Sequence, residues 1–115
     1  MRLFDFKSVV SVFYVKDIKE SISWYKKWLG EPDLVPLESV AEYQISNNSW
    51  LQLTCYKDDE FKTGSIIISV DDIHECKSKL NEIGIKTSEI AGYEAILVFD
   101  IFDIDGNQIS FAQEV

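Results

Sequence analysis

The chain has 115 residues, of which 46% are hydrophobic and 27% charged, and its formal net charge is −9. A chain of this length buries roughly 65% of its unfolded surface on folding, so it can build a core, and its composition is not that of a disordered polymer. The acidic charge argues against nucleic acid or an anionic membrane as a partner. No apolar run approaches the ~20 residues of a membrane span.

The first predicted elements are a strand over residues 8–15 and a helix over residues 17–29. The strand segment is rich in β-branched and aromatic residues. Asp17 is a suitable N-cap, Glu20 stands at the capping-box position, and Gly30 can end the helix. Apolar residues recur at helical spacing between these signals: Ile18, Ile22, Tyr25 and Leu29.

Three strands are expected to complete the first half. Pro32 and Pro36 confine any strand between them to a sheet edge. Residues 41–46 and 50–56 are predicted strands, joined by a hairpin turn at Asn47-Asn48-Ser49. The polar segment Lys57–Thr63 is the expected connection to the second half.

The second half repeats this order. Residues 65–70 form a nearly continuous apolar run, which predicts a strand buried on both faces. The helix predicted over 72–83 begins with Asp72 and Glu75, which align with the first capping box at an offset of 55 residues. Three further strands follow over residues 86–90, 94–102 and 108–114, the last two joined by a tight turn at 103–107. We therefore expect one domain of two modules, 1–57 and 64–115.

Cysteine usage and the N-terminus bear on the compartment. Cys55 and Cys76 stand far apart with no CxxC pair, which is typical of reduced, buried thiols. Asp5 and Lys7 interrupt the apolar start of the chain, so we interpret it as part of a strand rather than a signal peptide. A cytoplasmic protein is the expectation.

The repeat and three motifs resemble the vicinal oxygen chelate superfamily, which includes glyoxalase, extradiol dioxygenases, fosfomycin-modifying enzymes and bleomycin-resistance proteins. The motifs are Val15-x-Asp17-Ile18-x-x-Ser21, Trp24-Tyr25-x-x-x-Leu29-Gly30 and Asp103-Ile104-Asp105-Gly106-Asn107. Ile104 stands where the family turn usually has proline. The resemblance implies an α+β fold in which two tandem βαβββ modules curl their sheets around a shared cavity. The modules then pair either within one chain or between two exchanged chains.

Family enzymes hold a divalent metal through the first and last strand of each module. The resemblance places these positions at Val10, Ser65, Gln52 and Ser110, where the family uses histidine, glutamate or sometimes glutamine. About three protein ligands are needed, so we expect no metal and no cofactor. His74, the single histidine, lies on the solvent side of the second helix. A carboxylate-only magnesium site involving Glu38, Glu42 or Glu94 stays open.

Strand alternation assigns side chains to the expected cavity. The predicted lining is aromatic and neutral polar: Tyr14, Trp50, Gln52, Thr54, Tyr56, Ser65, Ser69 and Ser110. This mixture suits a small-molecule pocket. For each aromatic taken alone, core or interface packing is the competing interpretation.

Three function classes follow. The preferred one resembles the bleomycin-resistance proteins: metal-free binding or sequestration of a cationic aromatic compound or antibiotic, without chemistry, by a homodimer. The second is a lyase, isomerase or dioxygenase of the glyoxalase superfamily with an unconventional divalent-metal site. The third is a non-catalytic scaffold or interaction domain that kept the fold and lost its pocket. A shared fold does not choose among them, and no catalytic residue is assigned.

Overall fold

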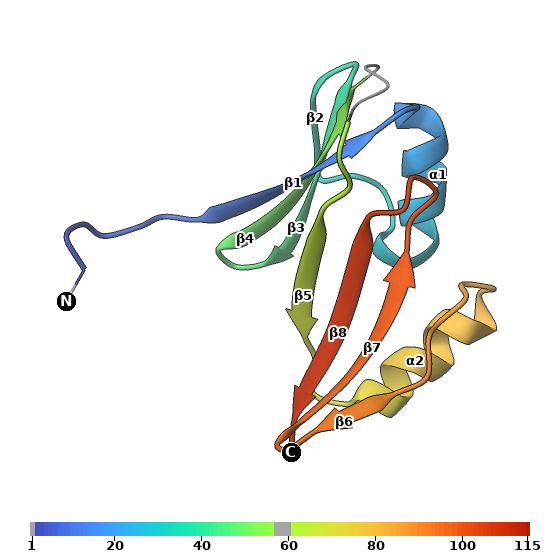
Figure 1. Ribbon diagram of the computed structural model, residues 1–115. Coiled ribbons are helices and arrows are strands. Elements are labelled where there is room, and N and C mark those ends of the chain that lie inside the picture. Colours follow the sequence, from blue (N-terminus) through green and yellow to red (C-terminus); the bar gives the residue numbers. More distant parts are fainter. Residues whose placement is uncertain (1, 57–60) are drawn as a thin grey trace. The chain divides into compact units, whose positions relative to one another are not determined.

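The computed structural model describes residues 2–56 and 61–115, and the chain forms two compact units, Met1–Phe61 and Lys62–Val115. Each unit has the order strand, helix and three strands, as Figure 1 shows. This confirms the α+β fold of two βαβββ modules. Of the connection expected over Lys57–Thr63, residues 57–60 lie outside the described part. None of the described helices is long and apolar enough to cross a membrane.

Unit 1 is a four-stranded sheet covered by one helix. Its strand order is β1-β4-β3-β2, with β1 parallel to β4 and the other neighbours antiparallel. As expected from its proline, β2 is an edge strand. The elements are β1 (Val9–Val15), α1 (Ile18–Leu29), β2 (Leu34–Leu37), β3 (Val40–Ser46) and β4 (Ser49–Cys55).

The predicted signals at the ends of α1 are confirmed. The Asp17 carboxylate accepts a hydrogen bond from the Glu20 amide at 3.1 Å. At the other end the Gly30 amide donates to the Lys26 carbonyl, and Gly30 has φ 78°. The helix packs on β3 and β4 and buries Tyr25, whose ring centroid lies 6.0 Å from that of Tyr43.

Unit 2 repeats this plan with strand order β5-β8-β7-β6, where β5 is parallel to β8. Its helix packs on β7 and β8. The Asp72 carboxylate caps the helix by accepting from the Glu75 amide at 3.0 Å. The elements are β5 (Ser65–Ser69), α2 (Ile73–Glu82), β6 (Ala91–Tyr93), β7 (Ile96–Phe102) and β8 (Gln108–Glu114).

The strand predicted over residues 86–90 is wrong, because the short strand β6 comes later in the chain. Ser88 does lie beside β7, where its amide donates to the Asp100 carbonyl at 3.0 Å. In a regular strand pair the Asp100 amide would donate back to the Ser88 carbonyl. Here it donates to the Ser88 hydroxyl instead, at 2.8 Å. A side chain thus replaces the backbone acceptor, so the ladder does not continue. Likewise β7 begins at Ile96 rather than 94, because Glu94 has φ 50° in the preceding turn.

The expectation that the 65–70 strand is buried on both faces is also wrong. None of the residues of β5 is fully buried, and Ile67 is 75% exposed. The reason is topological, since β5 is an edge strand with β8 as its partner in the sheet. An apolar run predicted a central strand, but position in the sheet decides burial.

The Asp103–Asn107 turn joins β7 to β8 and anchors the start of β5. The Asp103 carboxylate accepts from the Asp105 and Asn107 amides, each at 2.9 Å, and from the Asn107 side-chain amide at 2.9 Å. The Asn107 side-chain oxygen accepts from the Gly64 amide at 2.8 Å. Asp103 and Asn107 are buried, so this motif is a structural clasp within unit 2. Ile104, the departure from the family pattern, is exposed and outside these bonds.

Candidate functional site

In unit 1, alternate residues of each strand face the helix or point away from it. Phe13, Leu51 and Leu53 are buried on the helix side. The opposite side, which we call the open face, carries residues of even number on β1 and β4. The parallel register pairs them as Val10 with Trp50, Val12 with Gln52, and Tyr14 with Thr54. This is the face assignment that strand alternation predicted.

The structure brings the predicted residues of unit 1 together on its open face. The rings of Tyr14 and Tyr56 lie 5.1 Å apart between centroids. The Thr54 hydroxyl donates to the Gln52 side-chain oxygen at 2.7 Å. The Gln52 side-chain nitrogen donates in turn to the Glu42 carboxylate at 3.0 Å. An aromatic pair and a short polar ladder that ends on a carboxylate therefore share one face.

The open face of unit 2 carries a similar ladder. The Gln108 side-chain nitrogen donates to the Ser110 hydroxyl at 3.3 Å, and that hydroxyl donates to the Asp100 carboxylate at 2.6 Å. Ser65 lies opposite Gln108, and Ser69 lies opposite Ala112 in the parallel register. Both of these predicted serines are exposed.

The two carboxylates at the ends of the ladders are the residues that sequence reasoning undervalued. The sequence pattern suggests Glu42 only as a possible magnesium ligand, and it gives Asp100 no role. Both could have been found by counting outward from the hairpins. Glu42 and Gln52 are equidistant from Asn47, and Asp100 and Ser110 are equidistant from Asp105, as the strand registers confirm.

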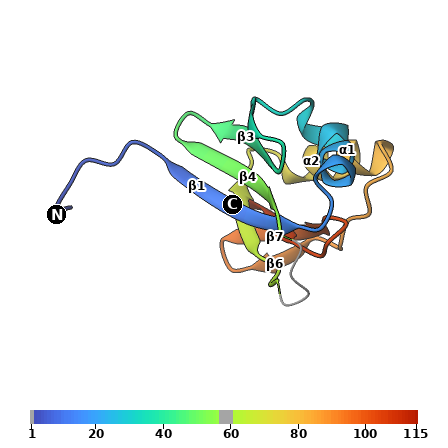
Figure 2. The same cartoon turned by 90° about the horizontal axis from the view of Figure 1, so that it is seen from above.

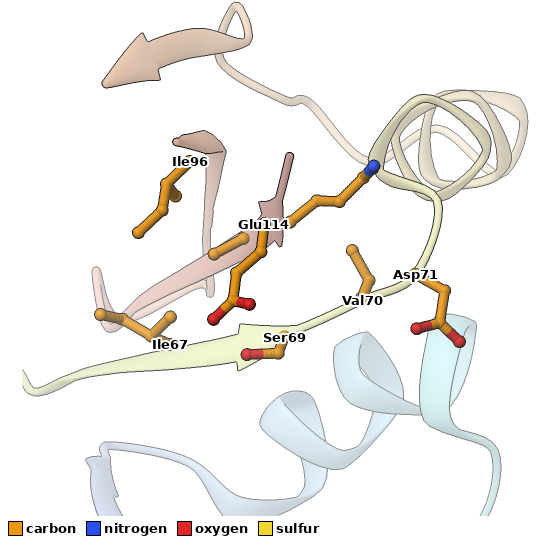
Figure 3. A pocket seen from close by; sticks show the side chains of 8 residues that line it. Ile67, Ser69, Val70, Asp71, Ile96 and Glu114 are labelled. Atoms are coloured by element: carbon orange, nitrogen blue, oxygen red, sulfur yellow. The ribbon is translucent and has the colours of Figure 1, made fainter. Parts of the chain in front are cut away.

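A concavity of about 450 Å³ lies at the carboxyl end of β5 in unit 2. Apolar side chains and two acidic residues surround it. Figure 3 shows the Glu114 carboxylate directed toward β5, where Ile67 and Ser69 lie, with Asp71 beyond Ser69. The lining comprises Ile67, Ser69, Val70, Asp71, Ile96, Ala112, Gln113 and Glu114. Within the described residues, neither Asp71 nor Glu114 forms an ion pair.

A smaller hollow of about 300 Å³ lies beside Asp100. It is lined by Lys86, Thr87, Ser88, Asp100 and Phe102. Phe102 is exposed and shares the open face of unit 2 with Asp100. The open face therefore combines exposed apolar side chains with carboxylates at two places along β7 and β8.

Comparison of the sequence with protein-family models and with curated proteins gives no match. Solved structures do match. A glyoxalase/bleomycin resistance protein from Catenulispora acidiphila superposes with a TM-score of 0.82 at 22% identity, covering 94% of this chain and 98% of that one. A glyoxalase-related enzyme from Clostridium phytofermentans gives 0.79 at 16% identity over 100% of both chains. Lactoylglutathione lyase from Agrobacterium tumefaciens gives 0.76 at 14%, covering 90% of each.

The chain has the fold of the vicinal oxygen chelate superfamily. The four positions that this superfamily uses for metal can therefore be tested against the structure. Val10 offers no donor atom, and the oxygen and nitrogen of the Gln52 amide are both engaged in the unit 1 ladder. The Ser110 hydroxyl donates its proton to Asp100, and Ser65 is an exposed residue that offers only a neutral hydroxyl. The side chains at these positions do not fit a divalent metal, which needs about three protein ligands.

The described residues also contain no cluster of carboxylates that could form the alternative magnesium site. Glu38 and Glu42 lie in unit 1, whereas Glu94 lies in the β6–β7 turn of unit 2. Across residues 2–56 and 61–115, no three histidine, cysteine, aspartate or glutamate side chains gather as metal ligands would. His74 is exposed on α2.

Proposed function

We propose that this vicinal oxygen chelate protein binds an organic cation with an apolar or aromatic body and releases it unchanged, as bleomycin-resistance proteins do. The observation that carries the proposal is the concavity of unit 2. Apolar walls from Ile67, Ile96 and Ala112 stand beside the carboxylates of Asp71 and Glu114. A ligand with a flat apolar body and a positive group satisfies both parts of this lining.

The size and charge of the site support the same ligand class. About 450 Å³ falls within the 300–1,000 Å³ typical of small-molecule sites. The exposed carboxylates of Asp71 and Glu114 attract a cation, and the apolar side chains beside them offer contact to its body. The net charge of −9 raises the local concentration of cations around the whole chain. The protein therefore favours cations both at long range and at the site.

The polar ladders extend this argument to both open faces. Each ladder directs its hydrogen-bond donors toward one carboxylate, Glu42 in unit 1 and Asp100 in unit 2. A carboxylate that accepts one such bond keeps lone pairs for an N–H donor of a ligand. Tyr14 and Tyr56 add π faces, which attract cations. At two positions where the resemblance implies a metal ligand, Gln52 and Ser110 instead donate to carboxylates. Those carboxylates can accept a further hydrogen bond from a charged ligand.

The test is calorimetric titration with a planar aromatic cation, ethidium, and its neutral parent phenanthridine. We expect ethidium to bind more tightly, and the double variant Asp71→Asn/Glu114→Gln to weaken it at least tenfold. A matched control, Glu82→Gln/Glu89→Gln, removes the same charge from exposed residues outside the concavity and should retain affinity. Mass spectrometry should recover the dye unchanged.

Three results would overturn the proposal. If neither dye binds, the protein does not bind the proposed class of ligand. If both double variants weaken ethidium binding equally, the dye is attracted by the general charge of the protein and not by the concavity. A stoichiometric divalent ion in the purified protein, together with conversion of a substrate, would favour the alternative function, a metal-dependent lyase, isomerase or dioxygenase.

A further inference from the structure

Two separate hollows border the open face of unit 2, and each combines a carboxylate with apolar side chains. The larger one, described above, holds Asp71 and Glu114 beside Ile96. The smaller one holds Asp100 beside the exposed Phe102. The same pairing of an acidic group with an apolar surface therefore occurs twice on one sheet.

The strand register sets the distance between the two hollows. β7 lies between β8 and β6, and both views show β6 and β7 side by side (Figures 1 and 2). Across β7 and β8, Ile96 pairs with Glu114 and Asp100 pairs with Ser110. The two pairs are four residues apart along each strand, from 96 to 100 and from 110 to 114, which is about 13 Å between Cα atoms. Because side chains alternate along a strand, residues four apart point to the same face of the sheet.

Short side chains form the surface between the two hollows. The pair between them is Val98 with Ala112, and Ser69 of β5 lies opposite Ala112. Val98 and Ala112 are half-buried, and Ser69 is exposed. Larger side chains stand at the two ends of this strip, Ile96 beside one hollow and Phe102 beside the other. A slender apolar chain laid along the strip would therefore reach from one hollow to the other.

The carboxylates at the two ends are open to a ligand. Within residues 2–56 and 61–115, none of Asp71, Asp100 and Glu114 forms an ion pair. One Asp100 oxygen accepts from the Ser110 hydroxyl at 2.6 Å, and a carboxylate has further lone pairs for a second donor. The Glu114 carboxylate is directed toward β5, the side on which Ser69 lies (Figure 3). Both ends of the strip therefore present negative charge to the same face.

Taking the cation binding proposed above as its basis, we propose that the ligand is an organic dication. One positive group lies at Asp71 and Glu114, the other lies at Asp100, and an apolar connector along the strip separates them by about 13 Å. Lys86 also borders the smaller hollow, and its ammonium repels a cation at Asp100. The larger hollow, with two carboxylates, is therefore the stronger of the two sites, and loss of the Lys86 charge should strengthen the weaker one.

The test is calorimetric titration of the full chain with three ammonium compounds. Decamethonium has two quaternary ammonium groups joined by a ten-carbon chain, hexamethonium has the same groups on a shorter chain, and decyltrimethylammonium has only one such group. We expect decamethonium to bind at least tenfold more tightly than either of the others. Asp100→Asn, which keeps an acceptor for the Ser110 hydroxyl, should remove most of that advantage and leave the affinity for decyltrimethylammonium within about twofold.

Three further variants separate the dication from general charge attraction. Asp71→Asn/Glu114→Gln should weaken both decamethonium and decyltrimethylammonium at least tenfold. Lys86→Met should strengthen decamethonium at least twofold and leave decyltrimethylammonium unchanged, a gain that misfolding does not produce. The control Glu82→Gln removes one charge from an exposed residue outside both hollows and should leave the affinity for decamethonium within about twofold.

The outcomes distinguish the dication from the cation binding on which it rests. If neither decyltrimethylammonium nor ethidium binds the native protein, the proposed function is wrong and the dication falls with it. If both bind, but Asp100→Asn and Lys86→Met leave decamethonium unchanged, the function stands and the dication is overturned. Equal affinity for decamethonium and hexamethonium also overturns it, because the spacing of the two charges then has no effect.

Discussion

Replacing Asn107 by alanine is expected to destabilise unit 2 far more than the loss of a few side-chain atoms suggests. Asn107 is fully buried, and its amide bridges two segments of the unit. Its nitrogen donates to the Asp103 carboxylate at 2.9 Å, and its oxygen accepts from the Gly64 amide at 2.8 Å. The first bond completes the turn, and the second ties the turn to the start of β5.

The size of the effect follows from these two bonds. A hydrogen bond to a charged group contributes about 1.5–3 kcal/mol, and a neutral one about 0.5–1.5 kcal/mol. Alanine removes the side-chain partner of the Asp103 carboxylate and of the Gly64 amide, while the backbone amides of residues 105 and 107 still donate to Asp103. The free energy of unfolding should therefore fall by about 2–4 kcal/mol. Asn107→Asp keeps the acceptor for Gly64 but faces Asp103 with a second carboxylate. We expect it to be at least as destabilising at pH 7 and to recover partly in acid, where a protonated side chain can donate again.

The measurement is urea unfolding followed by circular dichroism at 222 nm, comparing midpoints at unchanged slope. The control is Asn48→Ala, an exposed residue of the β3–β4 turn whose carbonyl, not its side chain, accepts from Val9. It should change stability by less than about 0.5 kcal/mol. If Asn107→Ala also falls within that limit, the clasp does not hold β5, and the explanation of the Asp-Ile-Asp-Gly-Asn motif fails.

Two further predictions concern Tyr43 and Glu94. Burial, assisted by the charges of Glu31 and Asp33, raises the pKa of Tyr43 to about 12 from 10.0. Stability should therefore fall as pH rises from about 10 to 12, and absorbance at 295 nm should show a late ionisation that Tyr43→Phe lacks. Among the described residues the Tyr43 hydroxyl has no hydrogen-bond partner, so Tyr43→Phe should abolish that loss and leave stability at pH 7 unchanged or up to about 1 kcal/mol higher; a clear loss at pH 7 would contradict this. Glu94 has φ 50°, so Glu94→Gly should stabilise by up to about 1 kcal/mol and Glu94→Val should destabilise in the same urea assay, whereas a stabilising valine would refute a strained turn.

Local signals predicted the elements of both modules well. Asp17 and Asp72 cap their helices as their capping boxes indicated, because capping depends on residues three apart and needs no tertiary partner. Strand alternation placed Leu51 and Leu53 under the helix and Gln52 on the open face. Counting outward from a hairpin turn also needs only the local sequence, and it places Asp100 opposite Ser110, as the register shows.

Burial and the extent of strands depended on non-local contacts. The apolar run of β5 predicted a central strand, yet its place at the sheet edge leaves Ile67 exposed. The segment 86–90 failed as a strand because a Ser88 hydroxyl, rather than its carbonyl, accepts from Asp100. Neither outcome can be read from composition, since each depends on which strand becomes the neighbour.

By itself, the sequence determined that the chain is a repeated strand–helix–three-strand unit, which follows from residue type and spacing along the chain. Its resemblance to the vicinal oxygen chelate superfamily implies that Val10, Gln52, Ser65 and Ser110 stand at the metal positions of that superfamily's enzymes. Only the tertiary structure showed that Gln52 and Ser110 donate to Glu42 and Asp100, and that Asp71 and Glu114 border one concavity with Ile67 and Ile96. Such groupings arise when strands distant in sequence are hydrogen-bonded side by side, which no local pattern encodes.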